Sequence, residues 1–182
     1  MSNFKKRFLI SLLAFPIIYI LLYQKILSNL LICLVCIFCA YEWHIIFKKK
    51  NFSYFFGLLI LLFFLTSLIK IYNLEDYNLK FLWLILVAWL TDIGGYIFGK
   101  IFGGPKLIKI SPNKTWSGAF GSLFLSQFAF IIYYLDPNFK VNTYIFIFQL
   151  FLSIVGQIGD ILMSYVKRIN NIKDTSNFIP GH

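Results

Sequence analysis

Long apolar runs, each separated from the next by a few polar residues, occupy most of the sequence. A helix needs about 20 mostly apolar residues to cross the hydrocarbon core of a bilayer. Several runs between residues 52 and 166 approach or reach that length, and the longer segment 8–47 predicts a helical hairpin. The predicted spans lie near residues 8–23, 26–47, 52–69, 79–98, 115–135 and 142–166. The sequence therefore predicts an all-α, polytopic integral membrane protein with about six transmembrane helices, arranged as a single membrane-embedded helical domain over residues 1–182.

Composition and charge exclude two broad classes of protein. Hydrophobic residues make up 59% of the chain, which is more apolar surface than a soluble domain of this size can bury. The net charge of +10 would fit a protein that binds nucleic acid, but the basic residues stand at the ends of the apolar runs rather than along one face. We therefore expect a lipid bilayer, and no nucleic acid, as a partner.

The basic residues also predict the orientation of the chain. Most of its 17 Lys and Arg residues would lie on one side of the membrane, and the exceptions are Lys25, Lys70, Lys80 and Lys140. Cytoplasmic loops are enriched in Lys and Arg. We therefore expect the N-terminus, the loop 99–114 and the segment 167–182 to be cytoplasmic, in a multi-pass protein of the cytoplasmic (inner) membrane.

Acidic residues inside the predicted spans share one depth. Glu42, Asp92 and Asp160 each precede a basic residue at the cytoplasmic end of their helix by about six to eight residues, which is roughly 9–12 Å. A carboxylate at that depth costs about 2.5–3.5 kcal/mol on insertion scales. We interpret Asp92 and Asp160 as the floor of a water-filled pocket that opens to the cytoplasm. Hydrogen bonding between helices is the alternative, and the role of Glu42 stays open.

The sixth predicted span carries a polar stripe. Its members recur at steps of three and four residues on an otherwise apolar helix and are Gln157, Asp160, Ser164, Lys167 and Arg168. Carboxylates suit a hard cation and basic groups suit phosphate oxygens, so the stripe fits a magnesium–polyphosphate complex. Ordinary anchoring at the membrane interface is the alternative for the two basic residues.

The loop before the fifth predicted span contains a second candidate anion site. Ser111 and Pro112 predict a turn, after which Lys114 and Thr115 stand at the start of the helix. A helix N-terminus with a hydroxyl and a lysine favours anions, although a simply capped helix start fits the same residues. In the preceding span the G-x-x-x-G spacing of Gly95, Gly99 and Gly103 favours close helix packing.

The segment 164–182, SYVKRINNIKDTSNFIPGH, resembles the signature of the phosphatidate cytidylyltransferases (CDP-diacylglycerol synthases). That pattern is S-x-(apolar)-K-R, four residues, then K-D-x-(small)-x-x-(apolar)-P-x-H. The matching positions are Ser164, Val166, Lys167, Arg168, Lys173, Asp174, Ser176, Ile179, Pro180 and His182. The segment 111–115 also resembles the family's S-P-x-K-T. The signature continues with G-G-x-x-D-R-x-D, which the sequence does not reach, so we expect an incomplete signature. A fragment of a longer coding sequence is the preferred explanation, and whether this chain is active or inactive is left open.

The resemblance implies a reaction and a set of site residues. The family transfers the cytidylyl group of CTP to phosphatidic acid, releases pyrophosphate and requires a divalent cation, usually Mg²⁺. On this basis the expected metal ligands are Asp174, Asp160 and Asp92. The expected catalytic residues are Asp174, Lys173, Asp160 and Ser164. The expected substrate-binding residues are Lys167, Arg168, Lys114, Thr115, Ser111 and His182. A homodimer is left open.

Other functions fit parts of the sequence. Intramembrane acids also mark the ion paths of transporters, but no predicted span carries an acid in its outer half. A CTP-dependent lipid kinase and a non-catalytic membrane subunit are further alternatives. Cys33, Cys36 and Cys39 have a spacing that superficially suggests a metal site, but buried cysteine in a membrane helix is the more ordinary interpretation.

Overall fold

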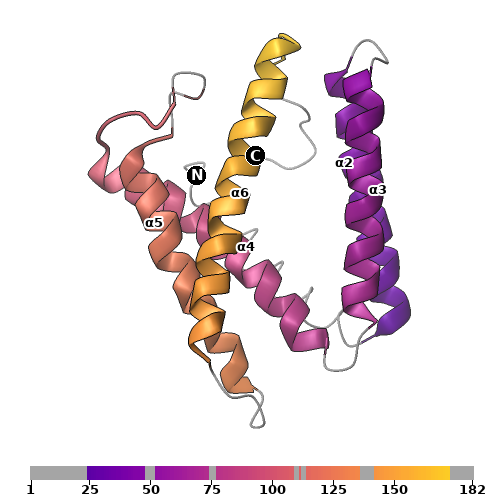
Figure 1. The fold of residues 1–182 in the computed structure, drawn as a ribbon, viewed down its shortest axis with the longest axis horizontal. Helices are drawn as coiled ribbons and strands as arrows, with labels where there is room; N and C mark the ends of the chain where they lie inside the picture. The colour runs from indigo at the N-terminus through magenta and orange to yellow at the C-terminus, as the bar shows by residue number, and fades with distance from the viewer. Residues whose placement is uncertain are drawn as a thin grey trace, which may run out of the picture. The chain divides into compact units, whose positions relative to one another are not determined.

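A computed structural model describes residues 24–47, 52–73, 77–108, 111, 114–135 and 142–172. The regular secondary structure of this part of the chain is helical (Figure 1). Its elements are α2 (Lys25–Ile46), α3 (Phe52–Tyr72), α4 (Tyr77–Phe102), α5 (Trp116–Ser126), the 3-10 helix η1 (Gln127–Leu135) and α6 (Thr143–Ile169).

Within the described residues, five helical segments are long and apolar enough to cross a membrane. This confirms the predicted polytopic, all-helical membrane protein. The five segments correspond to the predicted spans from 26–47 onwards, with α5 and η1 together forming the fourth of them. The first predicted span, 8–23, lies outside the described residues.

Three helices continue further than the sequence predicted. α3 continues to Tyr72 rather than residue 69, α4 to Phe102 rather than residue 98, and α6 to Ile169 rather than residue 166. α4 ends where Gly103 and Gly104 take positive φ angles of 57° and 99°, a conformation that favours glycine. The Gly103 amide donates to the Gly99 carbonyl at 3.2 Å. Gly103 therefore ends a helix rather than extending the close-packing motif.

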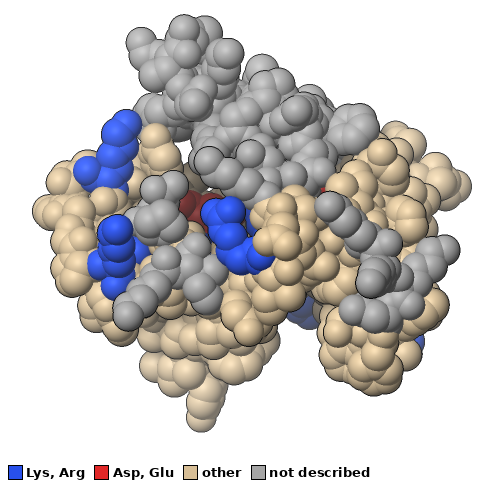
Figure 2. Space-filling model, turned by 90° about the horizontal axis from the view of Figure 1, so that it is seen from above, with Lys and Arg blue, Asp and Glu red and all other residues tan. Residues whose placement is uncertain are grey.

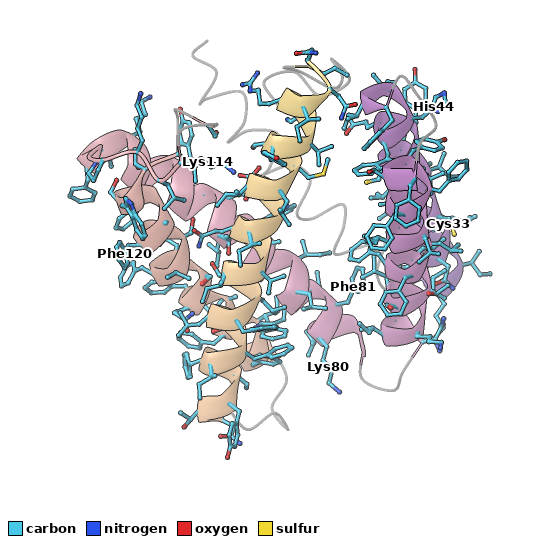
Figure 3. The ribbon with its side chains drawn as sticks, turned by 45° about the horizontal axis from the view of Figure 1, so that its top comes forward. Cys33, His44, Lys80, Phe81, Lys114 and Phe120 are labelled. Carbon is cyan, nitrogen blue, oxygen red and sulfur yellow. The ribbon has the colours of Figure 1, made fainter. Side chains whose placement is uncertain are left out.

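The chain divides into two compact units, residues 1–78 with 169–182, and residues 79–168. The single membrane-embedded domain stays a prediction. In the first unit α2 and α3 pack side by side. Gly57 leaves room for the Trp43 ring, whose Nε1 donates to the Tyr54 carbonyl at 3.0 Å. His44 Nδ1 lies 3.2 Å from the Tyr54 hydroxyl, and Figure 3 shows His44 near one end of the α2–α3 pair.

In the second unit α4 and α5 approach each other through glycine. An added Cβ at Gly94 would lie 3.0 Å from Ser122 Cα and closer still to the Gly121 carbonyl oxygen. Buried hydroxyl groups form hydrogen bonds between the helices. Ser122 Oγ donates to the Thr91 carbonyl at 2.7 Å, and Thr91 Oγ1 donates to Ser153 Oγ on α6 at 3.0 Å. α4, α5 and α6 are thus joined at one level by hydrogen bonds.

The predicted span 115–135 is helical throughout but changes type at Gln127, where α5 becomes the 3-10 helix η1. The fully buried Gln149 side chain of α6 contacts this region. Its amide oxygen accepts from Trp83 Nε1 at 2.8 Å and from the Phe130 amide at 2.9 Å. An amide that bonds to a neighbouring helix need not follow the α-helical ladder, which is consistent with the tighter 3-10 geometry here.

Candidate active site

A cavity of about 210 Å³ lies within the second unit, between α4, α5, α6 and the loop that precedes α5. α4 contributes Asp92 and Tyr96, four residues apart on one face. α6 contributes Gln157 and Asp160, which are also on one face. The loop contributes Lys114. The structure therefore brings the intramembrane acids Asp92 and Asp160 to one cavity, as their shared depth predicted.

Glycine makes room for this cavity. Gly95, Gly118 and Gly156 all line it. A Cβ added at Gly118 would lie 2.7 Å from the Gly95 carbonyl oxygen, and one added at Gly95 would lie 2.8 Å from Ser122 Oγ. The sequence analysis did not single out Gly118, although it and Ser122 are small residues one turn apart, a signal of close helix packing.

Backbone hydrogen bonds hold the loop that carries Lys114. Lys106 and Thr115 form an antiparallel bridge. The Leu107 amide donates to the Lys114 carbonyl at 2.8 Å, and the Lys114 amide donates to the Ser111 carbonyl at 3.1 Å. Ser111 therefore supports the Lys114 backbone through its own backbone oxygen and does not line the cavity as the described residues form it.

The start of α5 is a capped helix. Thr115 Oγ1 accepts from the Gly118 amide at 3.2 Å, and the Thr115 carbonyl accepts from the Ala119 amide at 3.0 Å. The Trp116 amide donates to the Pro105 carbonyl at 3.2 Å. Most of the amides that an anion would use are thus already bonded. Thr115 lines the cavity, so its predicted contact with substrate stays a prediction, but its geometry is that of a capping residue.

Lys114 and Asp160 form an ion pair, with Nζ 2.5 Å from Oδ2. The Lys114 side chain is 21% exposed and the Asp160 side chain 68% exposed. The Nζ atom itself has no contact with solvent and makes no regular hydrogen bond to any described residue. Figure 3 shows the Lys114 side chain directed toward α6. One basic and one acidic member of the predicted site are therefore in direct contact.

The remaining residues of the predicted site either do not line the cavity or lie outside the described residues. Ser164 Oγ donates to the Asp160 carbonyl at 2.8 Å, one turn back along α6. Ser164, Lys167 and Arg168 do not line the cavity as the described residues form it. The predicted stripe on α6 therefore meets the cavity only through its first part, Gln157 and Asp160. Lys173, Asp174 and His182 lie outside the described residues, and Glu42 belongs to α2 in the other unit.

The cavity lining suits a hard cation in its donor chemistry. Its ionisable oxygen donors are Asp92 and Asp160, and no His or Cys is among the described residues that line it. Such oxygen donors are those that Mg²⁺ prefers. Among the described residues, no three His, Cys, Asp or Glu side chains are placed so that together they could hold a metal ion. A third ligand for the cation would therefore come from a residue outside the described ranges, from water or from substrate. The same finding leaves Cys33, Cys36 and Cys39 as free thiols without a metal-binding arrangement.

Lys and Arg side chains occur on the face of the molecule that Figure 2 shows, with an acidic side chain visible deeper between them. In the second unit, Lys100 lies in the last turn of α4, and Lys167 and Arg168 lie in the last turn of α6. Lys80 and Lys114 lie at opposite ends of the unit (Figure 3).

The chain is similar to known enzymes over its whole length. A family model described as the cytidylyltransferase family matches residues 51–182. The phosphatidate cytidylyltransferase of Rickettsia bellii is 32% identical over 190 residues, which cover all of this chain and 82% of that protein. The phosphatidate cytidylyltransferase of Bacillus subtilis is 38% identical over 117 residues, 63% of this chain and 44% of the relative.

A third relative, the phosphatidate cytidylyltransferase of Staphylococcus aureus, is 43% identical over 105 residues, 56% of this chain and 40% of that protein. No solved structure matches the chain. The matched family region, residues 51–182, includes every described residue that lines the cavity. The family match and the full-length similarity to the Rickettsia enzyme show that the chain belongs to the cytidylyltransferase family, among the phosphatidate cytidylyltransferases.

Proposed function

We propose that the chain transfers the cytidylyl group of CTP to phosphatidic acid and that the cavity between α4, α5 and α6 is the place of this reaction. The family and its relatives support the reaction itself. One observation supports the location: Asp92, Lys114 and Asp160 line a single cavity within the matched region.

The reaction needs charge neutralisation more than it needs a reactive side chain. A phosphate oxygen of phosphatidic acid attacks the α-phosphorus of CTP, and a new P–O bond forms. The bond from that phosphorus to the oxygen leading to the β-phosphate breaks, so pyrophosphate leaves and CDP-diacylglycerol remains. Lys114 would bind phosphate oxygens, while Asp92 and Asp160 would hold a divalent cation, with Mg²⁺ neutralising the phosphate charge when bound.

The size of the cavity suggests which part of the substrate it holds. At about 210 Å³ it is smaller than the roughly 300–1,000 Å³ of pockets that enclose whole small-molecule ligands. Its lining combines three charged side chains, Asp92, Lys114 and Asp160, with neutral polar ones, a mixture that suits phosphate groups and a cation. The cavity would therefore hold phosphate groups and the cation, and the nucleoside and the acyl chains would lie beyond it.

The finer assignments also belong to this proposal. The basic residues in the last turns of α4 and α6, which are Lys100, Lys167 and Arg168, support an active site that faces the cytoplasm, in the cytoplasmic (inner) membrane. Lys167, Arg168, Lys173 and His182 would contact substrate, and Asp174 would complete the metal site. Homodimerisation stays a prediction.

Isotope position in CTP distinguishes the proposed reaction from its main alternatives. Membranes that contain the protein are incubated with phosphatidic acid and with CTP labelled at either the α- or the γ-phosphorus, and lipids are then extracted. Cytidylyl transfer carries the α-label into lipid and leaves the γ-label in water-soluble pyrophosphate. A lipid kinase would give the reverse result, and solute uptake without labelled lipid would favour a transporter.

A substitution connects this assay to the cavity. Asp160→Asn removes one cation-binding charge with little change in side-chain size, and we expect lipid labelling to fall by about 100-fold or more, as is typical when an electrostatic catalytic group is removed. The variant must elute with wild type in size-exclusion chromatography. Labelling at the wild-type rate would contradict the proposed location while leaving the reaction itself standing.

A further inference from the structure

We infer that Lys114 and the divalent cation compete for Asp160, and that phosphate groups of the substrate draw Lys114 away from this carboxylate. The inference rests on the proposed function because it assigns a device to the same cavity. Its first support is the ion pair, in which Lys114 Nζ lies 2.5 Å from Asp160 Oδ2. The ammonium group occupies one oxygen of the carboxylate that a cation at Asp160 would use.

The two ends of the Lys114 side chain are held very differently. Its backbone is fixed on both sides, since the Leu107 amide donates to its carbonyl and its own amide donates to Ser111. The next residue, Thr115, is the cap of α5. At the far end, Nζ has Asp160 as its charged partner and no regular hydrogen bond to any other described residue. The side chain can therefore exchange partners without moving the loop.

Nζ needs a partner because it has no contact with solvent. An unpaired ammonium group away from water is costly, so Lys114 stays on Asp160 until another anion is offered. A phosphate oxygen is such an anion, and it would enter through the open side of the cavity, where the Asp160 side chain is 68% exposed.

The charges in the cavity predict how a cation and phosphate groups affect each other's binding. Its described lining carries two carboxylates, Asp92 and Asp160, and one ammonium group, Lys114. A cation that arrives alone either displaces Lys114 from Asp160 or shares the carboxylate with it, and in both cases two like charges repel across a short distance. A cation that arrives with phosphate groups gives Lys114 a new partner. Cation and phosphate should therefore strengthen each other's binding, because such coupling is reciprocal.

The test measures binding of Mn²⁺ alone, with no nucleotide or lipid present. Purified protein in detergent micelles is titrated with Mn²⁺, and free Mn²⁺ is followed by electron paramagnetic resonance. Lys114→Met removes the competing charge, and we expect it to bind Mn²⁺ about 5- to 30-fold more tightly than wild type. Lys106→Met is the matched control, because Lys106 is exposed in the same loop and does not line the cavity. It should change Mn²⁺ affinity by less than about twofold.

A double-mutant cycle assigns the gain to Asp160. In the Asp160→Asn background the Lys114→Met change should give little or no gain, because the contested carboxylate is absent. An unchanged or lower Mn²⁺ affinity in Lys114→Met would overturn the inference, as would an equal gain in Lys106→Met or in the Asp160→Asn background. If Lys114→Met does not fold, Lys114→Gln carries the same test. Because no turnover is measured, these outcomes are independent of whether cytidylyl transfer occurs.

Discussion

Replacing Gly94 by alanine tests whether α4 and α5 pack with their backbones in direct contact. The added Cβ would lie 2.8 Å from the Gly121 carbonyl carbon, 3.0 Å from Ser122 Cα and closer still to the Gly121 carbonyl oxygen. All three atoms belong to the backbone of α5, so no side chain can turn aside to make room. Overpacking of this kind typically costs about 1–3 kcal/mol. Against it stands the better helix propensity of alanine, about 1 kcal/mol relative to glycine in water.

We therefore expect Gly94→Ala to lower the free energy of unfolding by up to about 2 kcal/mol, which is the overpacking cost of about 1–3 kcal/mol less the gain of about 1 kcal/mol in propensity. The free energy is measured by equilibrium unfolding in mixed micelles as the fraction of sodium dodecyl sulfate is raised, with helix content followed by circular dichroism. The matched control is Gly159→Ala, in the interior of α6, where an added Cβ would meet no atom within 4 Å. This control has the gain in propensity without the clash, so it should be neutral or stabilising by up to about 1 kcal/mol. Equal stability of the two variants would refute the proposed backbone contact.

Further substitutions and conditions test other contacts. Gln149→Leu leaves the buried donors Trp83 Nε1 and the Phe130 amide without their acceptor, so the same unfolding measurement should show a loss of about 2–4 kcal/mol. A loss below about 0.5 kcal/mol would show that these bonds do not form. Thr115→Ala removes the cap of α5 and should cost about 1 kcal/mol, whereas Thr115→Ser, which keeps the hydroxyl, should cost less. Chelation of divalent cations should abolish lipid labelling from α-labelled CTP, and added Mg²⁺ should restore it; labelling that persists after chelation would contradict the proposed metal dependence.

Apolar length predicted the existence of the membrane helices but not their ends. Bilayer thickness sets a minimum for each helix, and nothing in an apolar run says where the backbone stops being helical. α4 passes its exposed Lys100 and ends only where Gly103 adopts a positive φ. The apolar pattern also did not predict the change to a 3-10 helix at Gln127, in a segment that a side chain of a different helix, Gln149, contacts through the Phe130 amide. Long-range polar contacts of this kind leave no local periodicity.

The candidate site was predictable to the extent that depth and helix faces determine it. Asp92 and Asp160 were assigned to one pocket because they share a level in the membrane, and both line the same cavity. The contact of Lys114 with Asp160 could not be predicted, because it depends on how a loop folds back against α6. Ser164 shows the opposite case. It lies on the predicted stripe, yet its hydroxyl bonds to its own helix, since a helix face fixes direction but not partner.

The glycines of α4 and α5 explain why carboxylates at this depth are tolerated. Gly95 and Gly118 lie against each other where the two helices meet, and both also line the cavity. A side chain at either position would push the helices apart or fill the space beside Asp92. Asp160 lines the same cavity, and its side chain is 68% exposed. A carboxylate that keeps its contact with water costs far less than one in hydrocarbon. The close packing of α4 and α5 and the open space of the cavity therefore both depend on the absence of side chains at Gly95 and Gly118.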